Sequence, residues 1–142
     1  MHQLSKEFIG GFSMFKSNVL KISHTQLPVQ DLKRSSDFYL SILGFQKKGD
    51  FGEFAVVGLD KGATIFLWKT MDQTTATFTV NGEDIPSIGI EVESIDELRG
   101  KLEENGTKIA WSDQDQEGRK FLKFYDPDDN MLVAHEEPKR NT

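Results

Sequence analysis

The sequence predicts an α+β fold built from two tandem β-α-β-β-β modules, which form curved sheets around a half-barrel groove. Two observations lead to this prediction. The same order of elements, one strand, one helix and then three strands, can be read twice along the chain. In addition, residues 28–32 align with residues 91–95, and residues 52–68 align without a gap with residues 119–135. Only two copies are present, which indicates a duplication, because a solenoid needs at least three units.

The first module is predicted to span residues 19–80. The run VLKISHTQLPV (19–29) alternates between polar and apolar residues, a pattern that is typical of a strand. Asp31 is a suitable N-cap for a helix over 32–43, whose apolar residues fall on one side, and Gly44 ends that helix. Three further strands are predicted over 45–49, 53–59 and 63–69.

The second module repeats this order over residues 81–138. The segment SIGIEV (87–92) predicts a strand, and Ser94 followed by Glu97 forms a capping box for a helix over 95–104. Three further strands are predicted over 107–112, 119–125 and 131–136.

The segment DPDDN (126–130) joins the last two predicted strands. Its carboxylates lack the spacing, the central glycine and the terminal glutamate of a calcium-binding EF-hand loop, so it is interpreted as a turn. Residues 1–18 form an N-terminal extension, for which a short helix, an arm that packs on a partner and a frayed end all remain open. Residues 139–142 are a polar tail, and the 142 residues suit one domain, at 19–138.

The composition excludes several classes of function. The net charge is −6 and the Lys and Arg residues form no basic stripe, so nucleic acid is not expected as a partner. The absence of cysteine excludes disulfides, thiolate zinc sites and cysteine nucleophiles. No apolar run is long enough to span a membrane, and residues 1–18 lack the pattern of a signal peptide. We therefore expect a cytoplasmic protein without membrane contacts.

Four segments of the chain resemble the vicinal oxygen chelate superfamily, which includes glyoxalase I, bleomycin- and fosfomycin-resistance proteins and extradiol dioxygenases. They are KISHTQLPVQDLKRSSDFYLSILGF, GATIFLW, SIGIEVESIDELRGKLEENGTKI and FLKFYDPDDNMLVAHE, and the resemblance covers about residues 19–137. It implies the glyoxalase/bleomycin resistance/dioxygenase fold, a groove for a small molecule and a homodimer. It does not by itself select a reaction, because this scaffold carries several chemistries as well as proteins that only bind ligands.

The resemblance also implies four metal-ligand positions, at His24, Phe66, Ser87 and Val133. Metal-dependent members place His or Gln, Glu, His and Glu there, so only His24 matches. His135 lies two residues beyond Val133, which is roughly 6.6 Å along a strand. A nitrogen ligand must lie about 2 Å from zinc, so His135 replaces the missing ligand only if the strand shifts or bulges. We therefore expect no metal and no other cofactor, with a rearranged divalent-metal site as the alternative.

Several residues are candidates for contact with a ligand. Gln26 shares a strand face with His24, and the two could hold a polar group. Phe66 and Trp68 share a face of another strand and would form an aromatic wall for planar or cationic ligands, unless they simply fill the groove. Trp111 precedes the loop SDQDQEG and could anchor a ligand or the dimer, unless it packs in the core. The ligand-binding candidates are thus His24, Gln26, Phe66, Trp68, Ser87, Trp111 and Val133.

The leading hypothesis for function is a protein that binds a small organic molecule in the groove without the usual metal. The alternative is an enzyme of the same superfamily, a lyase, isomerase or dioxygenase, with a rearranged metal site around His24. Such an enzyme could also be a metal-free acid–base catalyst that uses His24, Glu91 or His135. Glyoxalase I activity is not expected, because polarising an enediolate needs a metal as Lewis acid. A third hypothesis is an interaction module whose groove is filled by its own side chains.

Overall fold

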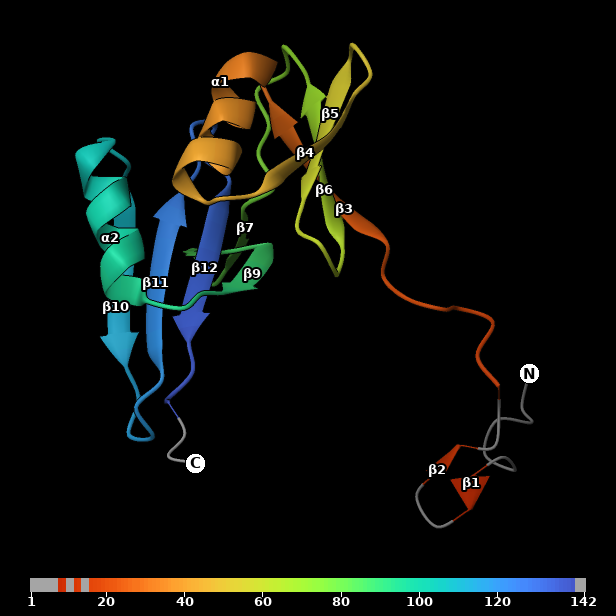
Figure 1. Cartoon of the computed structure of the whole chain (residues 1–142), viewed down its shortest axis with the longest axis vertical. Helices are drawn as coiled ribbons and strands as arrows, with labels where there is room; N and C mark the ends of the chain where they lie inside the picture. The colour runs from red at the N-terminus through yellow and green to blue at the C-terminus, as the bar shows by residue number, and fades with distance from the viewer. Residues whose placement is uncertain (1–7, 10–11, 14–15, 140–142) are drawn as a thin grey trace.

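The computed structural model describes residues 8–9, 12–13 and 16–139, and it contains two four-stranded sheets, each joined to a helical segment (Figure 1). The first sheet has the strand order β3-β6-β5-β4, and β3 and β6 are parallel. Its elements are β3 (His24–Val29), α1 (Leu32–Asp37), the π-helical turn η2 (Phe38–Ile42), β4 (Gln46–Asp50), β5 (Phe54–Gly58) and β6 (Thr64–Lys69).

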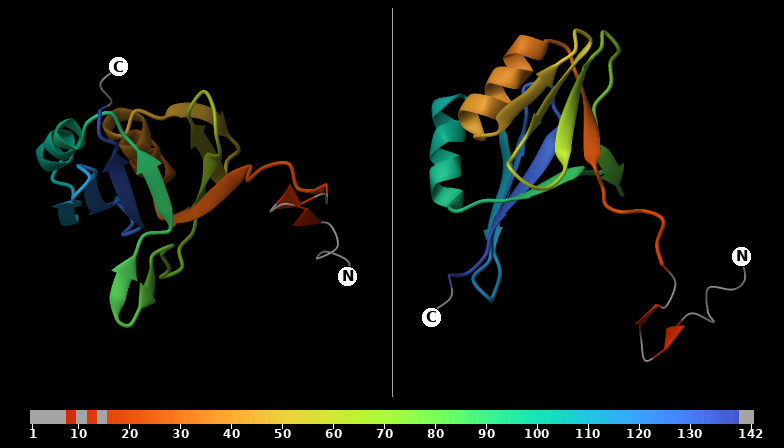
Figure 2. Two further views of the ribbon diagram at one scale, coloured as in Figure 1. Left: turned by 90° about the horizontal axis from the view of Figure 1, so that it is seen from below. Right: turned by 45° about the vertical axis from the view of Figure 1, so that its right-hand side comes forward.

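The second sheet has the equivalent order β10-β11-β12-β9, in which β9 and β12 are parallel. Its elements are β9 (Ile88–Glu91), α2 (Ile95–Glu104), β10 (Ile109–Gln114), β11 (Lys120–Tyr125) and β12 (Met131–Glu136). The predicted α+β fold with two β-α-β-β-β units is therefore confirmed, and both sheets are curved and open at their edges (Figure 2). In the described part of the chain, no helix has the length and apolar character needed to cross a membrane.

The two sheets have the same register, as the alignment of the two halves predicts. In the parallel pair of the first sheet, Gln26 lies opposite Phe66. In the parallel pair of the second sheet, Gly89 lies opposite Val133. Because Gln26 aligns with Gly89 and Phe66 with Val133, equivalent residues of the two halves occupy equivalent places in the sheets.

Three features differ from the sequence-based expectation. The strand expected over 19–29 begins only at His24, and the helix expected over 32–43 changes from α- to π-helical at Phe38. The linker between the two sheets forms an unpredicted hairpin of β7 (Phe78–Val80) and β8 (Glu83–Ile85), which projects from the body of the molecule (Figure 2). Its turn is made by Asn81 and Gly82, both with positive φ, which is the conformation of a type I′ turn.

The N-terminal extension is described only in part. Two short strands, β1 (Phe8–Ile9) and β2 (Phe12–Ser13), pair with each other, and the chain from residue 16 to β3 has no regular structure. The rest of 1–15 and residues 140–142 lie outside the described residues. Whether this extension packs on a partner therefore stays a prediction, and so does the boundary after residue 80, which falls at the turn of the β7–β8 hairpin.

Both predicted helix caps are present. The side chain of Asp31 accepts a hydrogen bond from the backbone N–H of Arg34 at the start of α1, and the Ser94 hydroxyl accepts one from the N–H of Glu97 at the start of α2. Gly44 has a φ of 79° directly after the helical segment, a conformation that suits glycine because it lacks a Cβ.

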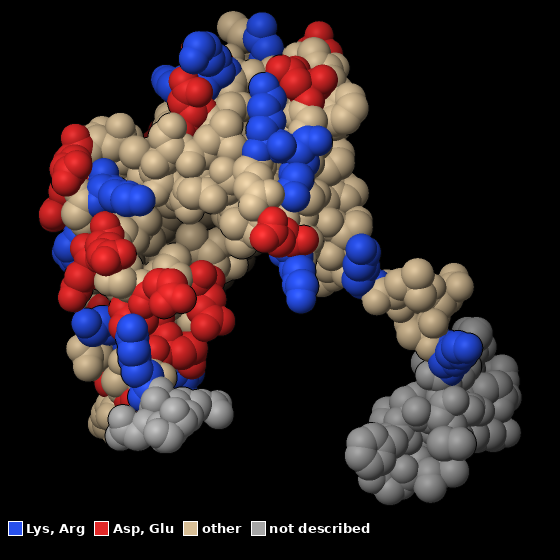
Figure 3. Space-filling view, viewed as in Figure 1, with Lys and Arg blue, Asp and Glu red and all other residues tan. Residues whose placement is uncertain are grey.

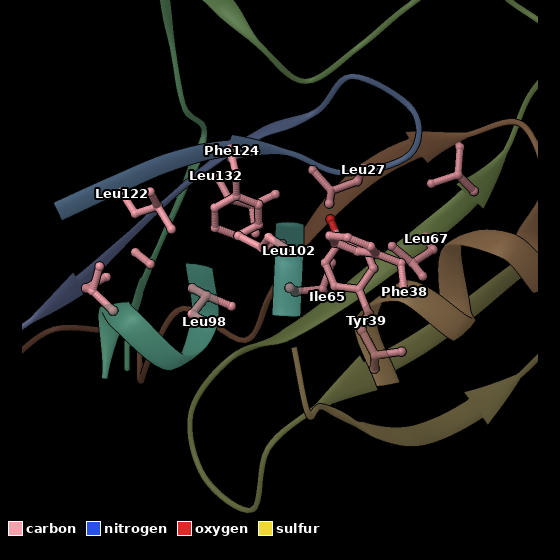
Figure 4. Packing of buried hydrophobic residues seen from close by; sticks show 14 residues of the cluster. Leu27, Phe38, Tyr39, Ile65, Leu67, Leu98, Leu102, Leu122, Phe124 and Leu132 are labelled. Carbon is pink, nitrogen blue, oxygen red and sulfur yellow. The ribbon is translucent and has the colours of Figure 1, made fainter. Parts of the chain in front are cut away.

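One hydrophobic core is shared by both modules (Figure 4). Leu27 and Leu67 point into it from the first sheet, and Leu122 and Leu132 point into it from the second. The helical segments lie on the same side of the molecule and contribute to the same cluster, including the buried Tyr39 (Figure 2). Each sheet therefore buries its helix-covered face, and because strand side chains alternate, the next residues along each strand point the other way.

The turn 126–130 also ties the modules together through buried hydrogen bonds, and we call these five residues the clasp. Asn130 donates from Nδ2 to the carbonyl oxygen of Pro28 at 2.9 Å, and its Oδ1 accepts from the N–H of Ala76 at 2.7 Å. The Tyr39 hydroxyl donates to Oδ2 of Asp126 at 2.8 Å. Burial raises the pKa of Asp126, although the hydrogen bonds that its carboxylate accepts from Asn130 and Tyr39 oppose that rise.

A second carboxylate of the clasp reaches the junction between β3 and α1. Asp128 accepts hydrogen bonds from the N–H of Gln30 and from Nη2 of Arg34, both at 2.9 Å, and from the hydroxyl of Ser35 at 2.6 Å. The segment that was interpreted as a simple turn is thus the main polar connection between the two modules.

We predict that Asn130→Ala destabilises the protein by about 2–3 kcal/mol, because it leaves the buried carbonyl of Pro28 and the N–H of Ala76 without partners. Urea denaturation monitored by circular dichroism measures this change. The matched variant Asn18→Ala removes an exposed side chain and should leave the free energy of unfolding unchanged. Equal stability of the two variants would show that the clasp contributes little.

Candidate ligand-binding face

The outer face of the first sheet carries a row of stacked rings, which we call the ring face: His24, Phe51, Phe54, Phe66 and Trp68. Trp68 stacks on Phe54 with 4.3 Å between centroids, and Phe54 stacks on Phe66 at 5.2 Å. The row continues through His24, whose ring lies 4.3 Å from that of Phe66. Phe51 branches from the row, because its ring also stacks on Phe54, at 4.9 Å. Five rings on three strands and a loop thus form one aromatic surface.

The register of the sheet explains why these rings meet. Phe54 lies opposite Trp68 in the antiparallel pair of β5 and β6, and both belong to the set of alternate residues that points away from the core. Phe51 and Phe54 are functional candidates that sequence reasoning missed. Phe54 could have been found, because pairing the two predicted strands across the turn at 59–62 places it near Trp68.

Gln26 lies on the same face and is held by Trp68. The indole Nε1–H donates to Oε1 of Gln26 at 2.6 Å. An indole nitrogen can only donate a hydrogen bond, so its acceptor must be the oxygen of the Gln26 amide. The Nε2 group of Gln26 can therefore donate to another partner. Both side chains are exposed, and no described residue accepts a hydrogen bond from that Nε2. The structure therefore brings four of the predicted residues, His24, Gln26, Phe66 and Trp68, onto one surface.

His24 is exposed, with Nδ1 at 2.9 Å from the hydroxyl of Ser23. The resemblance implies three further metal-ligand positions. Phe66 stacks on His24, whereas Val133 lies in the other sheet. Ser87 is exposed and lies just before β9. Within residues 8–9, 12–13 and 16–139, no group of three or more His, Asp or Glu side chains is placed to hold a metal ion.

The outer face of the second sheet is less aromatic. His135 hydrogen-bonds through Nδ1 to the carboxylate of Glu137 at 2.8 Å, and its ring lies 6.5 Å from that of Phe121. Glu91 is the neighbour of His135 in the parallel pair of β9 and β12, but the acid that His135 contacts is Glu137. The structure thus provides a histidine–carboxylate pair, with a different carboxylate from the one considered in the sequence.

Trp111 lies within β10, opposite Lys123 of β11. It is 44% exposed, and the ammonium of Lys123 is 5.0 Å from the centre of its ring, within the range of a cation–π interaction. Trp111 is therefore a surface residue and not part of the core.

The two modules differ in charge. Residues 81–138 contain sixteen acidic and six basic residues, whereas residues 19–80 contain six acidic and seven basic ones. Acidic side chains accordingly gather over the second module in Figure 3. The first module, which carries the ring face, is therefore close to neutral. The second module is strongly acidic.

Two clefts lie away from these faces. The larger has a volume of about 750 Å³ and is lined by residues of α1 and η2 and by the segments 105–108 and 125–129. The smaller, of about 510 Å³, lies between the clasp and the loop that follows β6. None of the residues proposed from the sequence lines either cleft, so the ring face is an open surface within a single chain.

The comparison with known families gives one match. The family model described as the Glyoxalase/Bleomycin resistance protein/Dioxygenase superfamily matches residues 21–134. No curated protein matches the sequence.

Several solved structures share the fold. The fosfomycin resistance protein FosX from Listeria monocytogenes has 19% identity and a TM-score of 0.68, over 84% of this chain and 95% of that one. TnmS3, an antibiotic binding protein from Streptomyces sp. CB03234, has 16% identity and a TM-score of 0.66, over 87% and 100%. A glyoxylase/bleomycin resistance protein/dioxygenase domain from Frankia sp. EAN1pec has 25% identity and a TM-score of 0.66, over 87% and 96%.

Proposed function

The chain belongs to the Glyoxalase/Bleomycin resistance protein/Dioxygenase superfamily, and from this premise we propose that it binds a flat organic molecule on the ring face without a metal ion. The observation that carries the proposal is the row of stacked rings. Trp68 and Phe51 are 38% and 61% exposed although they belong to one continuous aromatic surface. Contiguous apolar surface of this kind on a soluble protein commonly marks a binding site.

The energetics favour a planar ligand. Covering apolar surface is worth about 25 cal/mol per Å², and each well-placed aromatic pair adds about 0.5–1.5 kcal/mol. Because the rings of Phe54 and Phe66 stack on each other within 13° of parallel, they present their edges at the surface, and a flat ring system that covers them would gain both contributions through edge-to-face contacts. Two proteins of similar structure are a fosfomycin resistance protein and an antibiotic binding protein. At 16–19% identity they support the fold, and the ring face is what supports the class of ligand.

The four positions that carry metal ligands in the metal-dependent relatives do not fit a metal ion here. Phe66 and Val133 offer only carbon atoms, and the hydroxyl of Ser87 is a poor ligand for a divalent ion. The remaining imidazole, His24, is stacked on Phe66. We therefore derive no step of the function through a metal.

We also propose that a second copy of the chain closes the ring face. The helix-covered faces of both sheets are used in the shared core, so the outer faces are the surfaces left for association. Two acidic second modules would repel each other. The charges therefore favour a dimer in which the second module of one copy faces the nearly neutral first module of its partner. Trp111, Phe121 and His135 would then form the opposite wall of the groove.

One observation favours the enzymatic alternative. The Glu137 carboxylate holds Nδ1 of His135 at 2.8 Å, an arrangement that orients an imidazole as a general base and leaves Nε2 for a substrate. In that case His135 would be the catalytic base, Glu137 its positioning residue and Glu91 a neighbouring acid.

We predict that Phe66→Ala weakens the binding of flat aromatic compounds at least about tenfold, because it removes the ring that links His24 to Phe54 and so interrupts the stack. Thermal-shift screening identifies the compounds, and isothermal titration calorimetry measures their affinity. Phe78→Ala, which removes an exposed ring from the β7–β8 hairpin, is the matched control and should bind as the wild type does. If no flat compound binds, or if Phe66→Ala binds equally well, the ring face is not the site.

Elemental analysis of protein purified without a chelator should find divalent metal well below one ion per chain, because the implied positions offer only one suitable donor. Dialysis against EDTA should leave ligand affinity unchanged. One equivalent of metal that is lost in His24→Ala but retained in His135→Ala would contradict this prediction and would favour a metal enzyme.

Analytical ultracentrifugation should show a dimer at micromolar concentration. Trp111→Glu should convert it into a monomer, because it removes an aromatic ring from the interface and places a negative charge against the apolar ring face of the partner. Trp111→Phe keeps an aromatic ring and should remain dimeric. A wild-type protein that sediments as a monomer would rule out a groove made by two chains.

A further inference from the structure

We infer that the ligand of the ring face carries hydrogen-bond acceptors, carbonyl or carboxylate oxygens, on the edge of its flat ring system, and that it is not a cation. This inference rests on the proposed function, because it names the class of compound that the same face takes. It follows from the polar groups that the structure leaves available beside the rings.

The first of these groups is the amide nitrogen of Gln26. Trp68 uses up the oxygen of this amide, since its Nε1–H donates to Oε1 at 2.6 Å. The amide therefore presents its two N–H donors to whatever covers it. Gln26 lies opposite Phe66 in the parallel pair of β3 and β6 and is bonded to Trp68, so these donors lie beside the stacked rings. A ligand that covers them without accepting a hydrogen bond would leave a donor unsatisfied, which is costly.

The second group is the ammonium of Lys48, at the edge of the same face, which donates one hydrogen bond to Oε1 of Gln46 at 3.3 Å and has further N–H groups for a ligand. Gly58 belongs to the alternate residues of β5 that point outward with Phe54. A Cβ added to Gly58 would lie 3.6 Å from Cε of Lys48 and 2.9 Å from Cγ2 of Thr64. The lysine side chain therefore extends over this part of the sheet. Gly58 has no side chain, which leaves room for it there. A cation at this edge attracts an anionic or carbonyl group and repels a second cation.

The third observation concerns the strands beneath the rings. In β3, β5 and β6, the outward-pointing residues include no Asp or Glu. A cationic ligand would meet the positively polarised edges of the stacked rings and no carboxylate from these three strands, whereas an acceptor would find Gln26 and Lys48. The outward-pointing residues of β3, β5 and β6 are His24, Gln26, Pro28, Phe54, Val56, Gly58, Thr64, Phe66 and Trp68.

Two compounds with the same ring system test the inference: 2-naphthoate and 2-naphthylmethylamine. We expect the full-length wild-type protein to bind the carboxylate at least about tenfold more tightly than the amine in isothermal titration calorimetry. Gln26→Leu should remove most of this preference, and Gln26→Glu should reverse it by replacing the donor with a negative charge. Gln73→Leu, an exposed glutamine on the loop after β6, is the matched control and should keep the preference.

Trp68→Phe provides a second, independent variant, because it keeps a ring in the stack but removes the N–H that orients the amide of Gln26. It should bind both compounds with a reduced preference for the carboxylate. If the wild type binds the amine as tightly as the carboxylate, and Phe66→Ala weakens both, the inference is wrong while the ring face remains the site. If the wild type binds neither compound, the proposed function fails as well.

Discussion

The structure depends on one constraint, which is that the alternation of side chains along a strand lets only one face of each sheet contribute to the shared core. Leu27 and Leu67 point into a core that is shared by both modules, and so the residues before and after them must point outward. Gln26 and Trp68 follow this rule. Since both sheets bury the helix-covered side, the two outer faces are the large surfaces that remain for a ligand and for a second chain.

The resemblance to metal-dependent relatives implies metal-ligand positions at residues 24 and 66 of this chain. Phe66 offers no donor atom, and its ring stacks on that of His24. The same side chain thus leaves position 66 without a metal donor and connects His24 to the rest of the aromatic row. The equivalent position of the second module is Val133, beside Gly89, so the second sheet has no counterpart of this stack.

The elements of the fold could be predicted because they depend on local patterns, such as the alternation of the strands and the cap at Ser94. The β7–β8 hairpin was missed although Asn81 and Gly82 form a strong hairpin signal, because its strands have only three residues each. The geometry of the candidate site was only partly predictable. The alternation of the strands predicted that His24 shares a face with Gln26 and Phe66 with Trp68, but the bond between Gln26 and Trp68 depends on a parallel register that no local pattern specifies.

The clasp has a consequence for how the chain assembles as it leaves the ribosome. The N–H of Gln30 and the carbonyl of Pro28 belong to the first strand and helix to be synthesised, yet their partners are Asp128 and Asn130, near the end of the sequence. Until those residues emerge, the nascent first module has polar groups that only water can satisfy, and one side of its core is uncovered. The two halves are therefore repeated units in sequence but a single unit in folding.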